Sequence, residues 1–279
     1  MSADLHIHTN ISDGCLNPSE AVRKASDINL QAMAVTDHDT MDGVPEALRE
    51  GEKINIEVVP GVELSTEYKN REIHVLGYYV DPENKNFQLL LEKLRICRRK
   101  RVKNIVKKLN GLGCKVDLDE VMVLAGEGAV GRPHIARILT KKGYVNSVQD
   151  AFDRYIGFNA PAYVERYKLT PHEVIKAVLK AGGIPVLAHP GLIRNDNIIL
   201  ELMREGLRGL EAYHPEHNDE QTRKYQIMAL SRGLLLTGGS DCHGIDRLTG
   251  SEIGSVTVSM YHVEKLKQAA KKIKLEAGK

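Results

Sequence analysis

The sequence predicts an α/β fold in which a mostly parallel sheet, open or closed as a barrel, is surrounded by crossover helices. Two stretches of the chain, before residue 84 and after residue 168, alternate short apolar runs with helical periods, which is typical of such a sheet. The stretch between them has several helical periods and almost no strand-like run. A chain of 279 residues can bury the core of one domain with an insertion. We therefore expect a sheet domain at 1–83 and 169–279, and a helical insertion at 84–168.

The first stretch begins with a strand at residues 3–9. A helix toward Ile28 should follow, because Asn17 can cap it, Pro18 suits its first position and Glu20 lies in its first turn. The other elements expected here are a strand at 31–35, a helix at 43–53, a strand at 57–60 that ends at 61–63, and a strand at 74–80.

The second stretch resumes the same alternation. Thr170 can cap a helix that has Pro171 at its first position and Glu173 at its third, and that runs to Ala181. The elements expected after it are a strand at 184–189, a short helix, a strand at 209–213, a helix at 219–232, strands at 234–237 and 255–258, and a helix from 261 to about 275.

Metal-capable side chains gather where these expected strands end. His6 and His8 point the same way, because successive residues of a strand alternate between its faces. Further pairs and single residues of this kind are Asp37, His38, Glu63, His189, Glu211, Asp241 and His243. In a parallel barrel, ligand-binding residues collect at the carboxyl ends of the strands, so we expect these side chains to meet. Mixed imidazole and carboxylate ligands suit Mn²⁺, Zn²⁺ or Fe²⁺ rather than Ca²⁺.

Five motifs follow one another at these positions. They are H-x-H-T-x-x-S-D-G at 6–14, T-D-H-D at 36–39, G-V-E at 61–63, A-H-P at 188–190 and S-D-C-H at 240–243. This ordered set resembles the PHP (polymerase and histidinol phosphatase) superfamily over essentially the whole chain. The resemblance implies a distorted (β/α)7 barrel of the PHP type, with three divalent metal ions at its mouth. We expect Mn²⁺ first, with Zn²⁺ or Fe²⁺ as alternatives.

The resemblance also implies which residues hold each ion. The three implied sites are His6, His8, Glu63 and Asp241; Glu63 again with His74 and His189; and Asp13, His38 and His243. A carboxylate shared between two sites draws two cations together. Ions about 3.5–4 Å apart can generate a nucleophile at neutral pH and stabilise the leaving oxygen of a phosphate ester.

The segment Gly131–His134 of the insertion and the later stretch Glu211–Gln221 resemble one group of small phosphoesterases, which act on nucleoside 3′,5′-bisphosphates and in some cases trim short RNA from its 5′ end. Arg132 is expected to bind a phosphate, because a guanidinium offers a fork of donors that lysine lacks. The alternative is an exposed arginine at a helix N-terminus. Two further substrate-binding candidates are His134 and His217, and for His217 a structural role is equally consistent with the sequence.

Asp39 and His243 are the candidates for proton transfer, with an exposed loop position as the alternative for Asp39. We interpret His214 and Cys242 as structural residues. The segment 93–108 is rich in Lys and Arg, contains no acid and predicts an amphipathic helix. We interpret its basic face as solvated; the alternative is that it guides a short nucleic acid, although no aromatic residues are interleaved there for base stacking.

These features predict a metal-dependent phosphoesterase acting on phosphate monoesters of small nucleotides, with trimming of short RNA as a further activity. The alternatives are a histidinol-phosphate phosphatase, a non-catalytic metal-binding PHP module and an amidohydrolase-like enzyme. The insertion favours the first, the complete ligand set argues against the module, and no strand lysine stands beside the motifs, as an amidohydrolase would need.

The composition restricts the partners and the compartment. Formal net charge is +2, no apolar run is long enough to span a membrane, and the four cysteines form no C-x-x-C pair. We therefore expect no membrane and no obligate protein partner; the resemblance implies a small phosphorylated nucleotide as substrate, with short RNA as a further one. Reduced cysteines and the absence of a leader-like segment predict a cytoplasmic protein.

Overall fold

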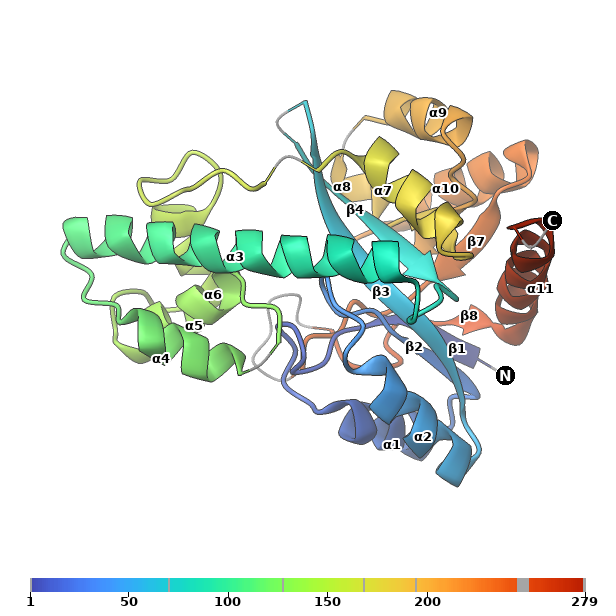
Figure 1. Ribbon diagram of the computed structural model, residues 1–279, viewed down its shortest axis with the longest axis horizontal. Coiled ribbons are helices and arrows are strands. Elements are labelled where there is room, and N and C mark those ends of the chain that lie inside the picture. The colour runs from blue at the N-terminus through green and yellow to red at the C-terminus, as the bar shows by residue number, and fades with distance from the viewer. Residues whose placement is uncertain are drawn as a thin grey trace.

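The computed structural model describes residues 2–69, 71–126, 128–167, 169–193, 195–244 and 251–277. Their strands form one eight-stranded sheet in the order β7-β6-β5-β4-β3-β2-β1-β8. Most helices lie around this sheet, and a group of helices extends to one side of it (Figure 1). The strands are β1 (Ser2–Ile7), β2 (Ala32–Val35), β3 (Glu57–Tyr68), β4 (Arg71–Tyr78), β5 (Ile184–Leu187), β6 (Gly209–Tyr213), β7 (Leu235–Gly238) and β8 (Val258–Ser259).

The sheet curves until its two ends nearly meet. Ile7 in β1 forms a parallel bridge with Cys242, which follows β7, so the first strand joins the segment after the seventh. The α/β barrel is therefore confirmed, with one difference in strand number. The resemblance implied seven strands, whereas the described residues add a short β8 that pairs antiparallel with β1.

The expectation of a parallel sheet is wrong for β4, which runs antiparallel to both β3 and β5. Only residues 69–70 separate β3 from β4, too few for the crossover that parallel strands require. The two strands instead form a long hairpin in which Glu63 pairs with Leu76, and Ser65 with His74. Cross-strand partners share a face, so Glu63 and His74 project on the same side of the hairpin.

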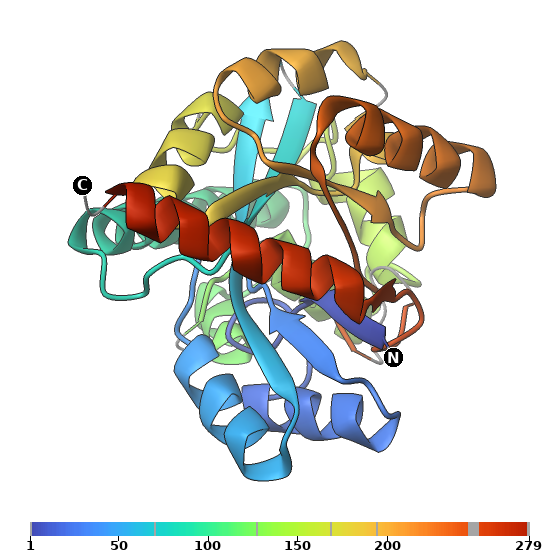
Figure 2. The ribbon, with the colours of Figure 1, turned by 90° about the vertical axis from the view of Figure 1, so that its right-hand side faces the viewer.

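Helices cover the outside of the barrel (Figure 2). The predicted capping boxes are confirmed at both helices: Asn17 and Glu20 cap the first, and Thr170 and Glu173 cap the helix after the insertion. The helices outside the insertion are α1 (Pro18–Asp27), α2 (Val44–Ile54), α7 (Pro171–Lys180), α8 (Pro190–Ile193), α9 (Asn197–Arg204), α10 (Asp219–Arg232) and α11 (Met260–Ala277).

The described residues of the stretch 84–168 form helices joined by loops and contain no strand. The elements are α3 (Lys85–Gly111), α4 (Leu118–Ala125), α5 (Arg132–Lys141), α6 (Val148–Ala151) and the π-helical turn η1 (Phe152–Ile156). They enclose a hydrophobic cluster of their own, to which Ile105 and Leu139 belong. Helix α3 has 27 residues and is about 40 Å long. Its first turns pack into the barrel through Phe87 and Leu91, so α3 joins the two cores.

Two further findings concern the chain as a whole. No helix among the described residues is long and apolar enough to cross a membrane. The described residues contain no disulfide bond.

Candidate metal centre and phosphate pocket

The first group of predicted ligands meets at the end of β1. His6 Nε2 lies 3.4 Å from both Glu63 Oε2 and Asp241 Oδ1. His8 Nε2 lies 3.3 Å from the same Glu63 oxygen and 3.1 Å from the same Asp241 oxygen. All four residues are buried, and one donor atom of each falls in a cluster small enough to surround one ion. This is the set that the sequence predicts for the first site.

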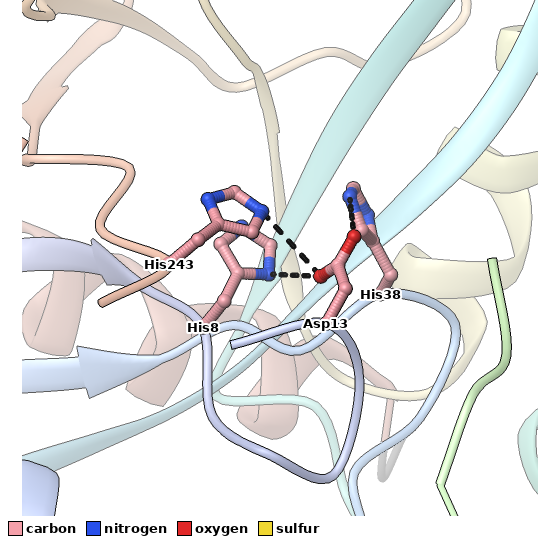
Figure 3. A group of neighbouring side chains, drawn as sticks. All are labelled: His8, Asp13, His38 and His243. Carbon is pink, nitrogen blue, oxygen red and sulfur yellow. Dashed lines mark ion pairs between the residues drawn. The ribbon is translucent and has the colours of Figure 1, made fainter. Parts of the chain in front are cut away.

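Figure 3 shows a second cluster, which shares His8 with the first. Asp13 Oδ1 lies 3.4 Å from His243 Nε2 and 3.8 Å from His8 Nδ1, and Asp13 Oδ2 lies 3.8 Å from His38 Nε2. The sequence predicts Asp13, His38 and His243 together. The structure adds His8, whose two ring nitrogens face the two clusters.

Glu63 lies at the centre of a third group. Its Oε1 is 2.8 Å from His74 Nδ1 and 3.1 Å from His189 Nε2, and its Oε2 is 3.0 Å from His38 Nδ1. Backbone hydrogen bonds between Glu63 and the segment Asp37–Asp39 hold His38 opposite Glu63. A carboxylate with imidazoles on both oxygens has the geometry of a bridging ligand.

The donor atoms fit metal ions better than they fit one another. Many of their separations exceed the usual hydrogen-bond length, and ligands at about 2.1 Å from a common ion lie roughly 3.0–3.5 Å apart. His8 Nδ1 and Asp13 Oδ1 are buried and have no hydrogen-bond partner in the described part of the chain. Buried polar atoms are rarely left in this state, so the arrangement indicates a place for cations.

The metal-free electrostatics agree with this. Although burial opposes its protonation, the Asp241 and Glu63 carboxylates raise the pKa of His8 to about 10. Burial likewise opposes protonation of His74, yet Glu63 and Glu72 raise its pKa to about 9. Burial raises the pKa of Glu63, but the surrounding histidines outweigh it and hold that pKa well below its usual range. The carboxylates therefore favour positive charge on the neighbouring histidines. Metal cations can provide this charge in place of protons, because the two compete for the same ligands.

Buried carboxylates behind the ligands fix their orientation. Glu211 Oε1 lies 2.8 Å from His6 Nδ1, and Glu211 Oε2 accepts a hydrogen bond from the backbone N–H of His189. A carboxylate at Nδ1 favours the tautomer that leaves Nε2 of His6 free for a cation. Asp4 accepts hydrogen bonds from the backbone of His6 and Ser240. The sequence places Glu211 at a strand end, but we missed its role and that of Asp4.

Asp37 organises the loop that carries Asp13. It accepts hydrogen bonds from the Thr9 backbone and hydroxyl and from the Ser12 hydroxyl, at 2.6–2.7 Å. Gly14 ends this loop, and a Cβ there would lie 2.4 Å from the carbonyl oxygen of His8. Thr9, Ser12 and Gly14 of the first motif thus support the turn that returns Asp13 to His8.

Three site residues have a left-handed backbone, with φ of 28° at His189, 49° at Asp241 and 53° at Asp39. Residues other than glycine rarely adopt this conformation, and it costs about 1–3 kcal/mol. Such strain concentrates at functional sites, where the surrounding structure imposes it.

The ligands open into a cavity of about 210 Å³ that is lined on its other side by arginines. The four arginines in its wall are Arg98, Arg101, Arg132 and Arg166. Glu72 lies between two of them: its Oε2 is 2.9 Å from Arg132 Nη2, and its Oε1 is 2.5 Å from Arg166 Nη2. The same Oε1 lies 2.9 Å from His74 Nε2. Arg132 therefore lies in the pocket as predicted, and Glu72 connects it with a predicted ligand.

The sequence interpretation of the basic face on α3 is wrong for two residues. Arg99 and Lys100 are exposed, but Arg98 and Arg101 turn into the cavity. Arg98 pairs with Asp39, whereas Arg101 donates to the carbonyl oxygen of Val164 and lies over the Tyr163 ring. Burial, together with the neighbouring Arg132 and Arg166, lowers the pKa of Arg101 to about 9. The crowded guanidiniums favour an anion between them.

The structure gives Asp39 a different environment from either sequence interpretation. It is not an exposed loop residue but is buried. Its Oδ2 accepts from Arg98 Nε at 2.6 Å, and its Oδ1 accepts from the Ser65 backbone at 3.0 Å. With both oxygens engaged, the carboxylate positions Arg98, a role that this geometry favours over proton transfer.

Two predicted substrate-binding histidines also have structural partners. His134 Nδ1 accepts from the Gly131 backbone at the start of α5, and His134 is not among the described residues that line the cavity. His217 lies with Nδ1 at 3.0 Å from the Ala212 carbonyl oxygen, and its Nε2 accepts from the Gly191 backbone. Both nitrogens of His217 are therefore occupied, so it holds the segment after His189 instead of facing a substrate.

His214 was interpreted as structural, and it contacts a predicted ligand. Its Nε2 lies 3.3 Å from Asp241 Oδ2, the oxygen that faces away from His6 and His8. His214 therefore supports the orientation of Asp241.

Comparisons with known proteins agree with this architecture. The PHP domain family matches residues 4–273. A 5′-3′ exoribonuclease of Haemophilus influenzae is 36% identical over 247 residues, which cover 86% of this chain and 89% of the relative. A 3′,5′-nucleoside bisphosphate phosphatase of Chromobacterium violaceum is 29% identical over a match that covers 86% of this chain and 86% of the relative. The crystal structure of a candidate metal-dependent phosphoesterase from Bifidobacterium adolescentis superposes with a TM-score of 0.90 at 30% identity, over 96% of each chain.

Proposed function

We propose that this chain, which belongs to the PHP domain family and is a hydrolase of phosphoester bonds, acts on small nucleotides of the nucleoside 3′,5′-bisphosphate type. One observation carries the proposal: a cluster of metal-type ligands and four arginines line the same small cavity. A phosphate can be cleaved on the ligand side of this cavity while the arginines hold a second phosphate.

In this proposal the nine predicted ligands hold divalent cations, with Mn²⁺ as the first candidate and Zn²⁺ or Fe²⁺ as alternatives. Nitrogen and carboxylate donors suit these ions. Bound cations would supply a nucleophile at neutral pH and positive charge opposite the developing negative charge. Three ions are the natural number for three clusters that share His8, His38 and Glu63.

The residues of the chain then divide the remaining work. Arg132 and Arg166 bind a phosphate through charge-assisted hydrogen bonds. Before the substrate binds, Glu72 holds both guanidiniums in position. Arg166 Nη1 is buried and has no hydrogen-bond partner among the described residues, which leaves a donor for the incoming anion. Arg98, fixed by Asp39, contributes further positive charge.

His243 cannot serve as ligand and proton-transfer group at once. Its Nδ1 lies 2.9 Å from the Asp241 carbonyl oxygen, so only Nε2 faces Asp13 and the cluster. We assign it to the cation. The absence of a disulfide bond among the described residues supports a reducing compartment, and we propose that the protein is cytoplasmic.

A second candidate substrate, the 5′ end of short RNA, is favoured by the size of the cavity. Its volume of about 210 Å³ is below the roughly 300–1,000 Å³ of most small-molecule sites. Much of a bound nucleotide must therefore lie outside the cavity, where an RNA strand could continue from it.

The test is turnover of a substrate panel by the purified protein with added Mn²⁺. Adenosine 3′,5′-bisphosphate, adenosine 5′-monophosphate, histidinol phosphate and a 5′-phosphorylated oligoribonucleotide would be compared by phosphate or nucleotide release. We expect the bisphosphate to have a higher kcat/KM than the monophosphates. A preference for histidinol phosphate would support the alternative phosphatase, and no turnover of any compound would support a non-catalytic module.

A further inference from the structure

A second and larger cavity, of about 840 Å³, lies beside the phosphate pocket. We propose that it binds the nucleotide that follows the one held at the metal centre, so that the enzyme recognises single-stranded nucleic acid through a second subsite. The inference deepens the proposed function and rests on it. We call this cavity the α3 groove; its lining residues on α3 and on the loop after η1 are Asn104, Lys107, Lys108, Phe158, Asn159 and Tyr163.

The α3 groove and the phosphate pocket meet at Arg101. Along α3, Arg101 lines the pocket, whereas Asn104 and Lys108 line the groove. Residues three and seven positions apart lie on one face of a helix, and seven residues rise about 10 Å. On the loop side, Val164 belongs to the groove and accepts a hydrogen bond of 2.8 Å from Arg101 Nε. The hydrogen bond between Arg101 and Val164 therefore joins the linings of the two cavities.

The relative sizes argue for a shared substrate. The phosphate pocket, at about 210 Å³, accommodates phosphate groups and little more, and the groove is four times as large. A nucleotide lies within the roughly 300–1,000 Å³ range of small-molecule sites. A strand whose phosphate enters the pocket past Arg101 would place its neighbouring residue in the groove.

The groove also has the chemistry that unpaired bases require. Phe158 is 62% exposed, and its ring centroid lies 5.5 Å from that of Tyr163 in an edge-on arrangement. An exposed ring supported from its edge is a platform for base stacking, which tolerates any base. Helix α3 has no interleaved aromatic residues, as the sequence indicated, but the loop that follows η1 brings Phe158 and Tyr163 against it.

The charges of the groove predict which interaction dominates. Lys107 and Lys108 are balanced by Glu67 and Glu165, which also line it, and Lys108 donates to the Tyr163 carbonyl oxygen at 2.6 Å. The lysines therefore provide local phosphate contacts and no strong net field. We expect stacking on Phe158 to contribute more than charge, and the salt dependence to be shallow.

The experiment compares two substrates in four single variants of the full chain. Phe158→Ala and Lys107→Gln alter the groove; Tyr261→Ala, at an exposed ring on α11, and Lys103→Gln, at an exposed lysine on α3, are matched controls. For 5′-phosphorylated tetraadenylate, kcat/KM should fall roughly 5- to 150-fold in Phe158→Ala, the range that one stacked base gives, and less in Lys107→Gln. Turnover of adenosine 3′,5′-bisphosphate should stay within about twofold in all four, because it makes no stacking contact in the groove.

Two results would overturn the proposal. Equal losses on both substrates would mean that the groove holds the base of the mononucleotide, and no loss on the tetranucleotide would mean that it holds no base. Fluorescence anisotropy with a labelled tetraadenylate and the metal-free protein provides a readout that needs no turnover. Absence of turnover in the unaltered enzyme would count against the proposed function alone, because binding in the groove is still measured by anisotropy.

Discussion

The barrel and the helical insertion contribute opposite charges to one cavity. All nine predicted ligands come from 1–83 or 169–279, whereas all four arginines of the pocket come from 84–168. The ligands are short side chains on strands and tight loops, which fix their positions. The arginines are long side chains on α3, α5 and the loop before α7. Cation ligands need exact spacing, while phosphate binding needs reach and several donors.

Glu72 is where the two regions are coupled. It belongs to β4, but its carboxylate lies between two arginines of the insertion and also contacts His74. Burial raises the pKa of Glu72, but Arg166 and Arg132 outweigh it and hold that pKa well below its usual range. The carboxylate is therefore charged at neutral pH and connects the ligand side with the arginine side.

The largest expected effect is on the barrel side, at the shared carboxylate. Glu63→Gln removes the charge that faces His6, His8, His38, His74 and His189. Both metal content and turnover should collapse, the latter by more than about 100-fold, which exceeds the usual cost of losing an outer-shell partner. Elemental analysis after purification with Mn²⁺ measures the metal. Asp13→Asn serves as the comparison, because it alters one cluster and should leave the other ions bound. Equal metal loss from both variants would contradict the assignment of Glu63 as the bridge.

On the insertion side, removal of an arginine should impair catalysis and leave the metals in place. Arg132→Ala should lower kcat/KM for adenosine 3′,5′-bisphosphate. The loss should correspond to about 1.5–3 kcal/mol of transition-state stabilisation, the value of a hydrogen bond to a charged group. Arg132→Lys should recover only part of this, because an ammonium cannot reproduce the fork. Steady-state kinetics and metal analysis of the same samples test both points. If Arg132→Ala lost its metals, the division of labour between barrel and insertion would be wrong.

Glu72→Gln tests the coupling between the two regions and should have an intermediate effect. The amide keeps the shape but loses the charge opposite the arginines and behind His74. Outer-shell partners of metal ligands contribute about 10–100-fold to metal affinity, so we expect an increase of at least about tenfold in the dissociation constant for Mn²⁺. Isothermal titration calorimetry measures it. An unchanged Mn²⁺ affinity with an altered KM would show that Glu72 serves the arginines alone.

The same division explains how much of the site could be predicted. Strand alternation and the ordered motifs locate His6, His8 and Asp241. These ligands lie at strand ends and in tight turns, which require particular residues close by in the sequence and so produce a recognisable motif. Arg98 and Arg101 lie at the edge of the apolar face of α3, and periodicity does not say which neighbour covers that edge. Arg166 lies in a loop with no periodic pattern. The strand β4 was expected at 74–80, but its antiparallel direction was missed, because the expected strands left 64–73 between them and hid the short connection at 69–70.

The smallest expected effect distinguishes the outer from the inner basic residues of α3. Arg99 and Lys100 are exposed, whereas Arg98 lies in the pocket and pairs with Asp39 at 2.6 Å. The double change Arg99→Gln/Lys100→Gln should leave kcat/KM for the bisphosphate within about twofold, because charges that are exposed to solvent outside the pocket are screened by salt. Arg98→Gln should lower it by an amount closer to Arg132→Ala, since the buried Asp39 then lacks its partner and the pocket loses a cation. Parallel kinetics at low and physiological ionic strength decide between them. Equal losses of kcat/KM in the outer and inner variants would mean that the whole basic face of α3 attracts the substrate by long-range electrostatics. The insertion would then act on the substrate outside the pocket as well as inside it.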